Sequence, residues 1–231
     1  MISRRNHAAR GVLGLPNWAN EPVCVVASGV STPAILGVLQ DCARQRHAGL
    51  MRFIVINKSH TLARWADMLY AADSGYWATS ESARAFRGLQ VAPDVQCQKH
   101  APRVLVVPIH TVCGKRVDQI NFTHHRIGGG GFSGFQALNV AIKTGSREIY
   151  LAGFDFHDHH WHADHTGILR NPDRAQLTKW RDLLDSQYDL IKSHGIQVYN
   201  LSDQSQLKNY PHKNCKSVCE KFTTLQTSVV C

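Results

Sequence analysis

The sequence predicts an α/β fold, a single Rossmann-like domain with a mostly parallel sheet and helices on both faces. Short, almost continuous apolar segments alternate with segments of helical periodicity, as expected for strands buried on both faces of a parallel sheet. Several of these apolar segments end in a polar residue, which in an open parallel sheet lies at the edge where ligands bind. The 231 residues are enough to bury one substantial core.

Composition and charge describe an ordinary globular protein with a basic surface. Hydrophobic residues make up 43% of the chain and charged residues 19%, which argues against a disordered polypeptide. The formal charge of +9 favours an anionic partner such as a nucleotide, a nucleic acid or an anionic glycan. Because Lys and Arg are spread along the chain rather than gathered in a basic run, nucleic-acid binding is allowed but not indicated.

The compartment is inferred from the N-terminus, the apolar segments and the cysteines. No run of about 18 apolar residues is present, and the basic N-terminus lacks the apolar core and cleavage site of a secretory signal. The seven cysteines form no CxxC pair, which favours reduced thiols. Cys215 and Cys219 are the only close pair, a weak zinc signal. We therefore expect a cytoplasmic protein without a membrane span.

The expected organisation is an N-terminal arm (1–21), a Rossmann-like domain (22–211) and a C-terminal tail (212–231). In the domain, the first strand (22–27) runs directly into the small residues Ser28 and Gly29 before a helical stretch. Strand, small-residue turn and helix in this order form a phosphate or ribose cradle in doubly wound folds. The full GxGxxG pattern is absent, so this signal is weak by itself.

Two further strands end in polar residues. The second strand (52–56) ends in Asn57, which can hydrogen-bond a base or ribose but is also a common turn former. Residues 62–69 have helical spacing, and the apolar segment 68–72 leads into Asp73, a further candidate for nucleotide binding. Another short strand is predicted at 104–109, whereas 114–126 shows no clear period.

A glycine run opens the most informative stretch of the sequence. Gly128 to Gly131 allow positive φ and a close approach to a ligand, although a mobile surface loop is the alternative. Ser133 is predicted to cap a helix that ends at Gly145. The unpaired N–H groups at the start of this helix would face an anion. A buried strand follows at 148–154, and Asp155 stands where it ends.

A loop rich in His and Asp follows that strand. Its titratable residues are Asp155, His157, Asp158, His159, His160, His162, Asp164 and His165. One hypothesis is general acid–base catalysis by at least one His, and a second is a metal site, although no HExxH or similar motif is present. A divalent ion held by Asp155 and phosphate oxygens is then more plausible than an all-protein site. The third alternative is a solvated polar loop.

The C-terminal part of the domain is predicted to contain one long helix and one strand. Residues 173–194 place apolar side chains on one face and charges on the other. Gly195 is expected to terminate this helix, and the last strand is predicted at 197–201.

The segments 132–141 and 149–156, with His165 ahead of a long helix, resemble the core of the bacterial lipooligosaccharide sialyltransferases. The resemblance covers about residues 22 to 211 and extends to a wider superfamily. That superfamily includes a domain of motility-associated glycosylation proteins and the archaeal hydroxymethyl-dihydropterin pyrophosphokinases. The segments 65–73 and 161–165 are also similar to phage-encoded proteins of unassigned role.

The resemblance implies specific roles for residues at the ends of the strands. The nucleotide would be held at the first two strand ends and at the start of the central helix, by Ser28, Gly29, Asn57, Ser133 and Gly134. The sugar donor would be framed by Gly153, Asp155 and Phe156, and His165 would deprotonate the acceptor hydroxyl. His157 stands where the sialyltransferases place a Tyr that supports the leaving phosphate.

Three functions follow as hypotheses. The leading one is a nucleotide-dependent transferase, a glycosyltransferase that moves a sugar from a nucleotide sugar to an acceptor glycan or other hydroxyl compound. In it, His157 or a metal at Asp155 would steady the leaving phosphate. The second is pyrophosphoryl transfer with a divalent ion, magnesium or manganese. The third is a non-catalytic protein that binds a nucleotide or nucleic acid. A homo-oligomer is compatible with each of the three.

Overall fold

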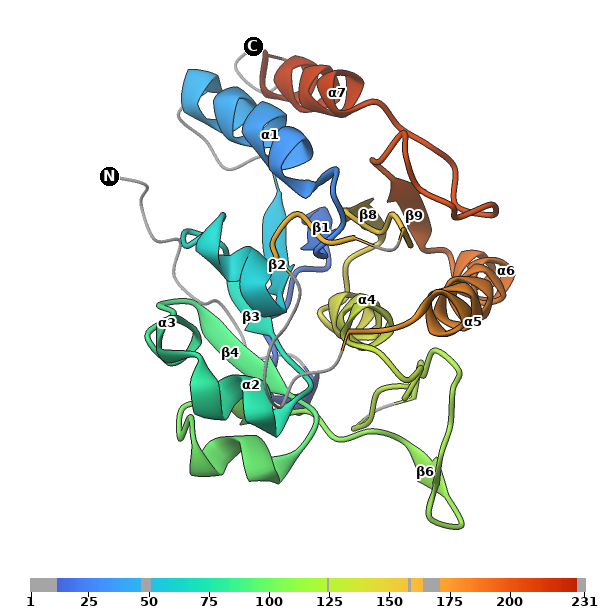
Figure 1. Ribbon diagram of the computed structural model, residues 1–231. Coiled ribbons are helices and arrows are strands. Elements are labelled where there is room, and N and C mark those ends of the chain that lie inside the picture. The colour runs from blue at the N-terminus through green and yellow to red at the C-terminus, as the bar shows by residue number, and fades with distance from the viewer. Residues whose placement is uncertain (1–11, 47–50, 124, 158, 164–170, 228–231) are drawn as a thin grey trace.

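The structure is a computed structural model that describes residues 12–46, 51–123, 125–157, 159–163 and 171–227. At its centre is a seven-stranded sheet with the order β5-β4-β3-β2-β1-β8-β9 (Figure 1). All neighbouring strands in this sheet are parallel. The strands are β1 (Val23–Val26), β2 (Arg52–Ile56), β3 (Met68–Tyr70), β4 (Leu89–Ala92), β5 (Leu105–Val106), β8 (Glu148–Ala152) and β9 (Gln197–Asn200). The predicted α/β class is confirmed.

Helices cover both faces of the sheet (Figure 1). One face carries α1 (Thr32–Arg46), α2 (Ser74–Thr79), α3 (Glu81–Arg84) and α7 (Cys215–Thr227). The other carries α4 (Ser133–Lys143), α5 (Arg174–Asp185) and α6 (Tyr188–Ser193). Short 3-10 helices lie at η1 (Val12–Gly14), η2 (Asn57–Thr61) and η3 (Val95–Lys99). A separate antiparallel hairpin of β6 (Thr111–Val112) and β7 (Lys115–Arg116) projects from the body.

The alternation of β1 side chains divides the core into two layers. Val23 and Val25 pack in the cluster that contains α4, whereas Cys24 and Val26 pack in the cluster that contains α1. All four side chains are fully buried, because β1 lies between β2 and β8 and has helices above and below it. Burial on both faces explains why this strand is apolar at every position.

Both ends of the described chain pack on this body. Leu15 and Trp18 are buried in the α4 cluster, and the Trp18 N–H donates to the Thr144 carbonyl. At the other end, the stretch expected to form a tail contains α7, which lies beside α1 and buries Val218 and Cys219 (Figure 1). Cys219 is disulfide-bonded, so the expectation of reduced thiols throughout is wrong at this residue.

Two predicted helices differ from the structure. Residues 62–67 form turns instead of a helix, because the Asp67 carboxylate binds the Phe53 N–H and Arg52 and ties this stretch to the start of β2. The long helix predicted at 173–194 is divided into α5 and α6. At the break, Asp185 accepts hydrogen bonds from the N–H groups of Lys208 and Asn209, and Gln187 accepts one from Ile120.

The remaining differences are smaller. The strand β4 was not predicted, and the strand expected at 104–109 is limited to β5. Ser133 is the first residue of α4 and not its cap, because the N-cap is Phe132 and makes no side-chain hydrogen bond. Gly145 does follow the end of α4, with a φ of 87°, as predicted. None of the described helices is long and apolar enough to cross a membrane.

Val25→Ala tests the burial of β1. Removing two fully buried methyl groups should lower the free energy of unfolding by about 2–3 kcal/mol, from lost burial and the cavity that remains. Val112→Ala is the matched control, since Val112 is 55% exposed in the hairpin, and it should change stability by less than about 0.5 kcal/mol. Urea unfolding of both variants measures the difference, and equal effects would contradict the central position of β1.

Candidate functional site

The topology of the sheet predicts a ligand crevice at the carboxyl ends of β1 and β8. After β1 the chain builds β2 to β5 on one side and then returns to build β8 and β9 on the other. In open parallel sheets this change of direction marks the ligand-binding crevice. The four predicted strand-end residues Ser28, Asn57, Asp73 and Asp155 all follow strands whose carboxyl ends share this edge.

Asp155 joins the end of β8 to the start of α1. Its side chain is only 1% exposed, and its two oxygens accept hydrogen bonds from Ser31. The N–H of Ser31 donates to Oδ2 at 2.8 Å and its hydroxyl donates to Oδ1 at 2.7 Å. The carboxylate therefore positions the turn after β1. A direct role of Asp155 in catalysis, and a metal ion bound to it, stay predictions.

The metal hypothesis also depends on which side chains gather near one another. Among the described residues, no group of three or more His, Cys, Asp or Glu side chains is placed to hold a metal ion. At Asp155, a divalent ion would have to share or displace the two hydrogen bonds from Ser31. The described part of the chain therefore supplies no ready set of protein ligands for a metal ion.

Gly29 and Gly153 lie where the turn after β1 contacts the turn after β8. The Gly29 N–H donates to the Gly153 carbonyl at 2.9 Å. A Cβ on Gly29 would lie 2.3 Å from Asp155 Oδ2, and a Cβ on Gly153 would lie 2.0 Å from Thr32 Oγ1. Gly153 also has a φ of 71°, which favours glycine. Steric packing alone therefore explains why both positions are glycine. Their contacts with a nucleotide and its sugar stay predictions.

The segment after β8 crosses the carboxyl end of β1. His160 forms an antiparallel bridge with Gly29, and the Trp161 N–H donates to the Ser28 carbonyl at 3.1 Å. The Trp161 indole N–H reaches Ser59 Oγ at 3.4 Å. In Figure 1 this segment runs from the end of β8 over β1 toward β2. It therefore brings His160 and Trp161 onto the turns that follow the first two strands.

Asn57, at the end of β2, has a buried side-chain oxygen without a hydrogen-bond donor among the described residues. The residue has a left-handed backbone, with a φ of 48°. Its Oδ1 atom is buried and accepts no hydrogen bond from a described residue. Two residues later, Ser59 is fully buried and donates to the Ala27 carbonyl at 2.8 Å, with Ser28 Oγ 3.3 Å away. These contacts bring the first two strand ends together around a buried acceptor that lacks a donor.

His60 supports the turn that carries Asn57. Its Nδ1 lies 2.9 Å from the Asn57 carbonyl and 3.0 Å from the Tyr76 hydroxyl, and its Nε2 lies 3.0 Å from Ser82 Oγ. Burial lowers the pKa of His60 below its usual value, so the ring is neutral near pH 7. A neutral ring that donates from Nδ1 to the Asn57 carbonyl accepts at Nε2 from Ser82.

His157 is held by a chain of hydrogen bonds from α5. Arg181 donates to the Gln206 side-chain oxygen at 3.3 Å, and the Gln206 amide lies 3.1 Å from His157 Nδ1. His157 Nε2 lies 2.6 Å from the Gln204 carbonyl. Because the carbonyl can only accept, Nε2 carries the proton and Nδ1 accepts from Gln206. These contacts therefore fix the orientation of the His157 ring. His165, the predicted general base, lies outside the described residues.

An aromatic cluster lines the edge between the glycine run and β8. Phe156, with a φ of 58°, lies 5.9 Å from Phe132 between ring centroids, and Phe132 stacks on Trp180 at 5.1 Å. A Cβ on Gly134 would lie 2.7 Å from the Phe132 ring. Gly131 is exposed, with a φ of 75°. The start of α4, with Ser133 and Gly134, is thus fixed beside Phe156 at the same edge.

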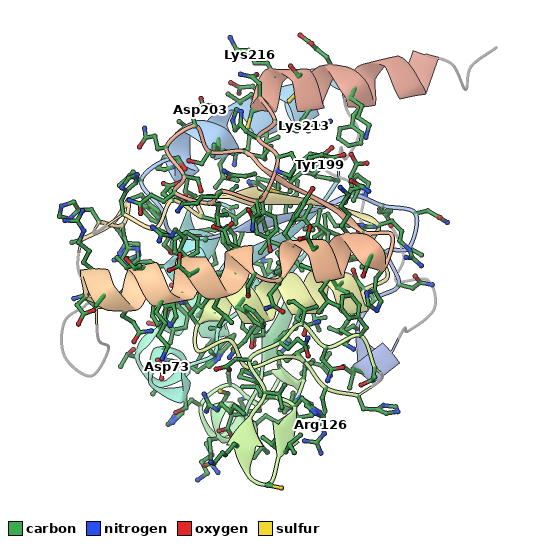
Figure 2. All side chains as sticks on the ribbon, turned by 90° about the vertical axis from the view of Figure 1, so that its right-hand side faces the viewer. Asp73, Arg126, Tyr199, Asp203, Lys213 and Lys216 are labelled. Carbon is green, nitrogen blue, oxygen red and sulfur yellow. The ribbon has the colours of Figure 1, made fainter. Side chains whose placement is uncertain are left out.

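Asp73 is the outlying member of the predicted set. It is exposed and precedes α2, and β3 is separated from β1 by β2. Figure 2 shows Asp73 near the bottom of the view and Tyr199 of β9 near the top, and β3 and β9 lie on either side of β1 in the strand order. Three residues that shape the site were not among the predicted set: Ser31, Ser59 and Trp161. Only proximity in the fold identifies them, although Ser59 follows the predicted Asn57 by two positions.

Comparison with known proteins defines the fold but not a family. No protein-family model matches the chain, and no curated protein matches it at a significant level. Among solved structures, the MAf glycosyltransferase from Magnetospirillum magneticum AMB-1 is similar, with a TM-score of 0.59 and 16% sequence identity. The similarity covers 90% of this chain and 37% of that one, so this chain spans little more than a third of its length. At this identity the likeness shows a shared Rossmann-like fold.

Gly153→Ala tests the contact between the two turns. Gly114 has nearly the same φ, 74°, but nothing within 4 Å of an added Cβ, so Gly114→Ala measures the backbone cost alone. Gly153→Ala adds the clash with Thr32 and should be less stable than Gly114→Ala by about 2–3 kcal/mol. Thermal and urea unfolding provide the comparison, and equal destabilisation would show that the turns are not in contact.

Thr32→Ala in the Gly153→Ala background tests the same contact from the other side. The substitution removes the oxygen at 2.0 Å and leaves the Ala27 carbonyl, at 3.0 Å, as the nearest atom. We expect the double variant to lose less free energy of unfolding than the two single variants lose together, by about 1 kcal/mol or more. An additive double-mutant cycle would contradict the arrangement.

Proposed function

We propose that the protein is a nucleotide-dependent transferase, and specifically a glycosyltransferase that uses a nucleotide-sugar donor. The observation that carries the proposal is the buried Oδ1 atom of Asn57 without a donor, at the edge where parallel sheets of this kind bind ligands. A buried acceptor left unsatisfied costs about 1–3 kcal/mol. A ribose hydroxyl or a base amino group would supply the missing donor once the Asn57 turn opens enough to admit it.

The surrounding groups fit the phosphates of such a ligand. The helices α1 and α4 both begin at the carboxyl edge of the sheet, since each leads into a parallel strand. Helix N-termini attract phosphate through their free N–H groups and dipoles. At the start of α1 the Ser31 N–H already donates to Asp155, so the start of α4 would supply these donors. We assign the nucleotide to Ser28, Gly29, Asn57, Ser133 and Gly134, with Gly131 and Asp73 at the periphery. The donor sugar would lie against Gly153 and Phe156, and Asp155 would hold the turn between them.

The transfer step would use two histidines. His165 would accept the proton of an acceptor hydroxyl as that oxygen attacks the anomeric carbon and the bond to the nucleotide phosphate breaks. His157 would donate from Nε2 to the leaving phosphate, which would require exchange of its hydrogen bond with the Gln204 carbonyl. A bound divalent ion, magnesium or manganese, would supply further stabilisation of the leaving phosphate if the reaction requires one.

The proposed setting is a cytoplasmic protein with a glycan or other hydroxyl compound as acceptor. The glycosyltransferase-like fold and the strand-end residues support transfer in general, and the resemblance to the sialyltransferases favours a cytidine nucleotide sugar. The same scaffold would also carry pyrophosphoryl transfer. The two reactions differ in ligand, because the second requires a triphosphate with a metal ion.

Asn57→Gly tests the proposed nucleotide contact. Glycine keeps the left-handed backbone and removes only the side chain, so the fold should be preserved. A thermal-shift panel of nucleotides and nucleotide sugars, with and without magnesium or manganese, first identifies the ligand. We then expect Asn57→Gly to bind that ligand about fivefold to tenfold more weakly, as for one lost hydrogen bond.

Cys113→Gly is the control for this experiment. Cys113 has the same backbone conformation, with a φ of 49°, in the exposed hairpin, so its replacement should leave the affinity unchanged. Unaltered binding by Asn57→Gly would remove Asn57 from the site. Stabilisation of the wild-type protein only by a triphosphate with metal would favour pyrophosphoryl transfer, and no response to any nucleotide would favour an accessory role.

His165→Ala tests the proposed base. Turnover should fall by two or more orders of magnitude while nucleotide affinity stays nearly constant, because a general base acts on the transition state and not on donor binding. His100→Ala is the matched control, since His100 is exposed at the end of η3. Steady-state kinetics with the identified donor measure both variants. Full turnover by His165→Ala would exclude His165 from the mechanism.

A further inference from the structure

A second hollow lies beside the crevice, between the glycine run and α5. It has a volume of about 490 Å³, within the range of about 300–1,000 Å³ that is usual for small-molecule sites. Side chains and backbone from three parts of the chain meet there. The lining includes Asp118, Gly131, Asp173, Gln176, Lys179 and Trp180. The proposed nucleotide site uses only Gly131 from this set.

Trp180 gives this cavity a fixed aromatic wall with a free donor. Its ring stacks on Phe132 at 5.1 Å with an interplanar angle of 22°, so its orientation is set by packing. A Cβ on Gly131 would lie 3.3 Å from the indole nitrogen, which places the indole N–H beside the exposed Gly131. This N–H donates no hydrogen bond to a described residue. A ligand in the cavity can therefore accept from it.

The polar groups around Trp180 combine acceptors and donors. Asp118 accepts from the Gly130 N–H through Oδ1, and Asp173 accepts from the Gln176 N–H through Oδ1. The second oxygen of each carboxylate accepts no hydrogen bond from a described residue. Lys179 and the Gln176 amide supply further donors at the rim. Two carboxylates outnumber the single ammonium group, which disfavours a phosphate or another anion.

The position of the cavity connects it to the proposed reaction. Phe132, which supports Trp180, also contacts Phe156 at the end of β8, with 5.9 Å between ring centroids. Phe132 therefore connects Trp180 in the cavity wall to Phe156 at the end of β8. A molecule in the cavity would lie next to the place assigned to the donor sugar.

We infer that this cavity binds a neutral polyhydroxylated ligand, a pyranose sugar, and that this sugar is part of the acceptor. The acceptor role rests on the proposed function, whereas the binding of a sugar does not. Hydroxyl groups donate to the open carboxylate oxygens, sugar oxygens accept from Trp180 and Lys179, and the apolar face of the ring packs on aromatic surface. A nucleotide phosphate does not fit this combination of groups.

Ligand-observed NMR tests the inference with defined probes. The neutral probes are the methyl glycosides of glucose, galactose and N-acetylglucosamine, and the anionic probes are methyl glucuronide and inorganic phosphate. We expect at least one neutral glycoside to bind. Trp180→Phe keeps the stacking on Phe132 but removes the N–H, and it should weaken binding about fivefold. Lys179→Met, at an exposed position, is a second variant that should weaken binding without affecting the fold.

Trp65→Phe is the matched control, because Trp65 is 41% exposed and packs on Phe53 away from the cavity. It should leave sugar binding unchanged. The inference is overturned if no neutral glycoside binds, if only the anionic probes bind, or if Trp65→Phe weakens binding as much as Trp180→Phe. Nucleotide binding, followed in parallel by thermal shift, separates the two claims: sugar binding without nucleotide binding contradicts only the proposed function, and the reverse contradicts only this inference.

Discussion

The site depends on one buried carboxylate. Asp155 accepts two hydrogen bonds from Ser31 and thereby fixes the end of β8 against the turn that begins α1. Because the two strands end side by side where the direction of the sheet changes, this link sets the floor of the crevice. The two glycines in the contact, Gly29 and Gly153, leave no room for a side chain. The backbone of the turn is consequently held in place before any ligand arrives, and a preorganised site binds a ligand at lower entropic cost.

A second layer of contacts builds on this floor. The segment that follows Asp155 crosses β1 through His160 and Trp161 and reaches Ser59 at the end of β2. His157, at the start of that segment, is held in one orientation by Gln206. The described part of the histidine-rich loop is thus tied to the strand ends at several points. The arrangement places the carboxyl ends of β1, β2 and β8, the His157 imidazole and the cavity beside Trp180 along one edge of the sheet.

The sequence was most informative where local pattern and tertiary structure agree. Apolar runs such as 52–56 and 148–152 are buried on both faces, so each matches a strand closely, and the polar residues after them share one edge. Other features depend on contacts between distant residues and leave no periodic signal. The break between α5 and α6 arises from Asp185 and Gln187 binding remote backbone groups. The pairing of Ser31 with Asp155 spans 124 positions, so spacing alone could not reveal it.

The central claim is that a nucleotide occupies the carboxyl ends of β1, β2 and β8. Hydrogen-exchange mass spectrometry tests it most directly, with and without the nucleotide or nucleotide sugar that stabilises the protein most. We expect slower exchange in three separate peptides, around residues 27–33, 57–62 and 153–161, because bound phosphate and ribose would protect these turns from opening. Protection confined to other segments, or a stabilising nucleotide that leaves these three unchanged, would contradict it.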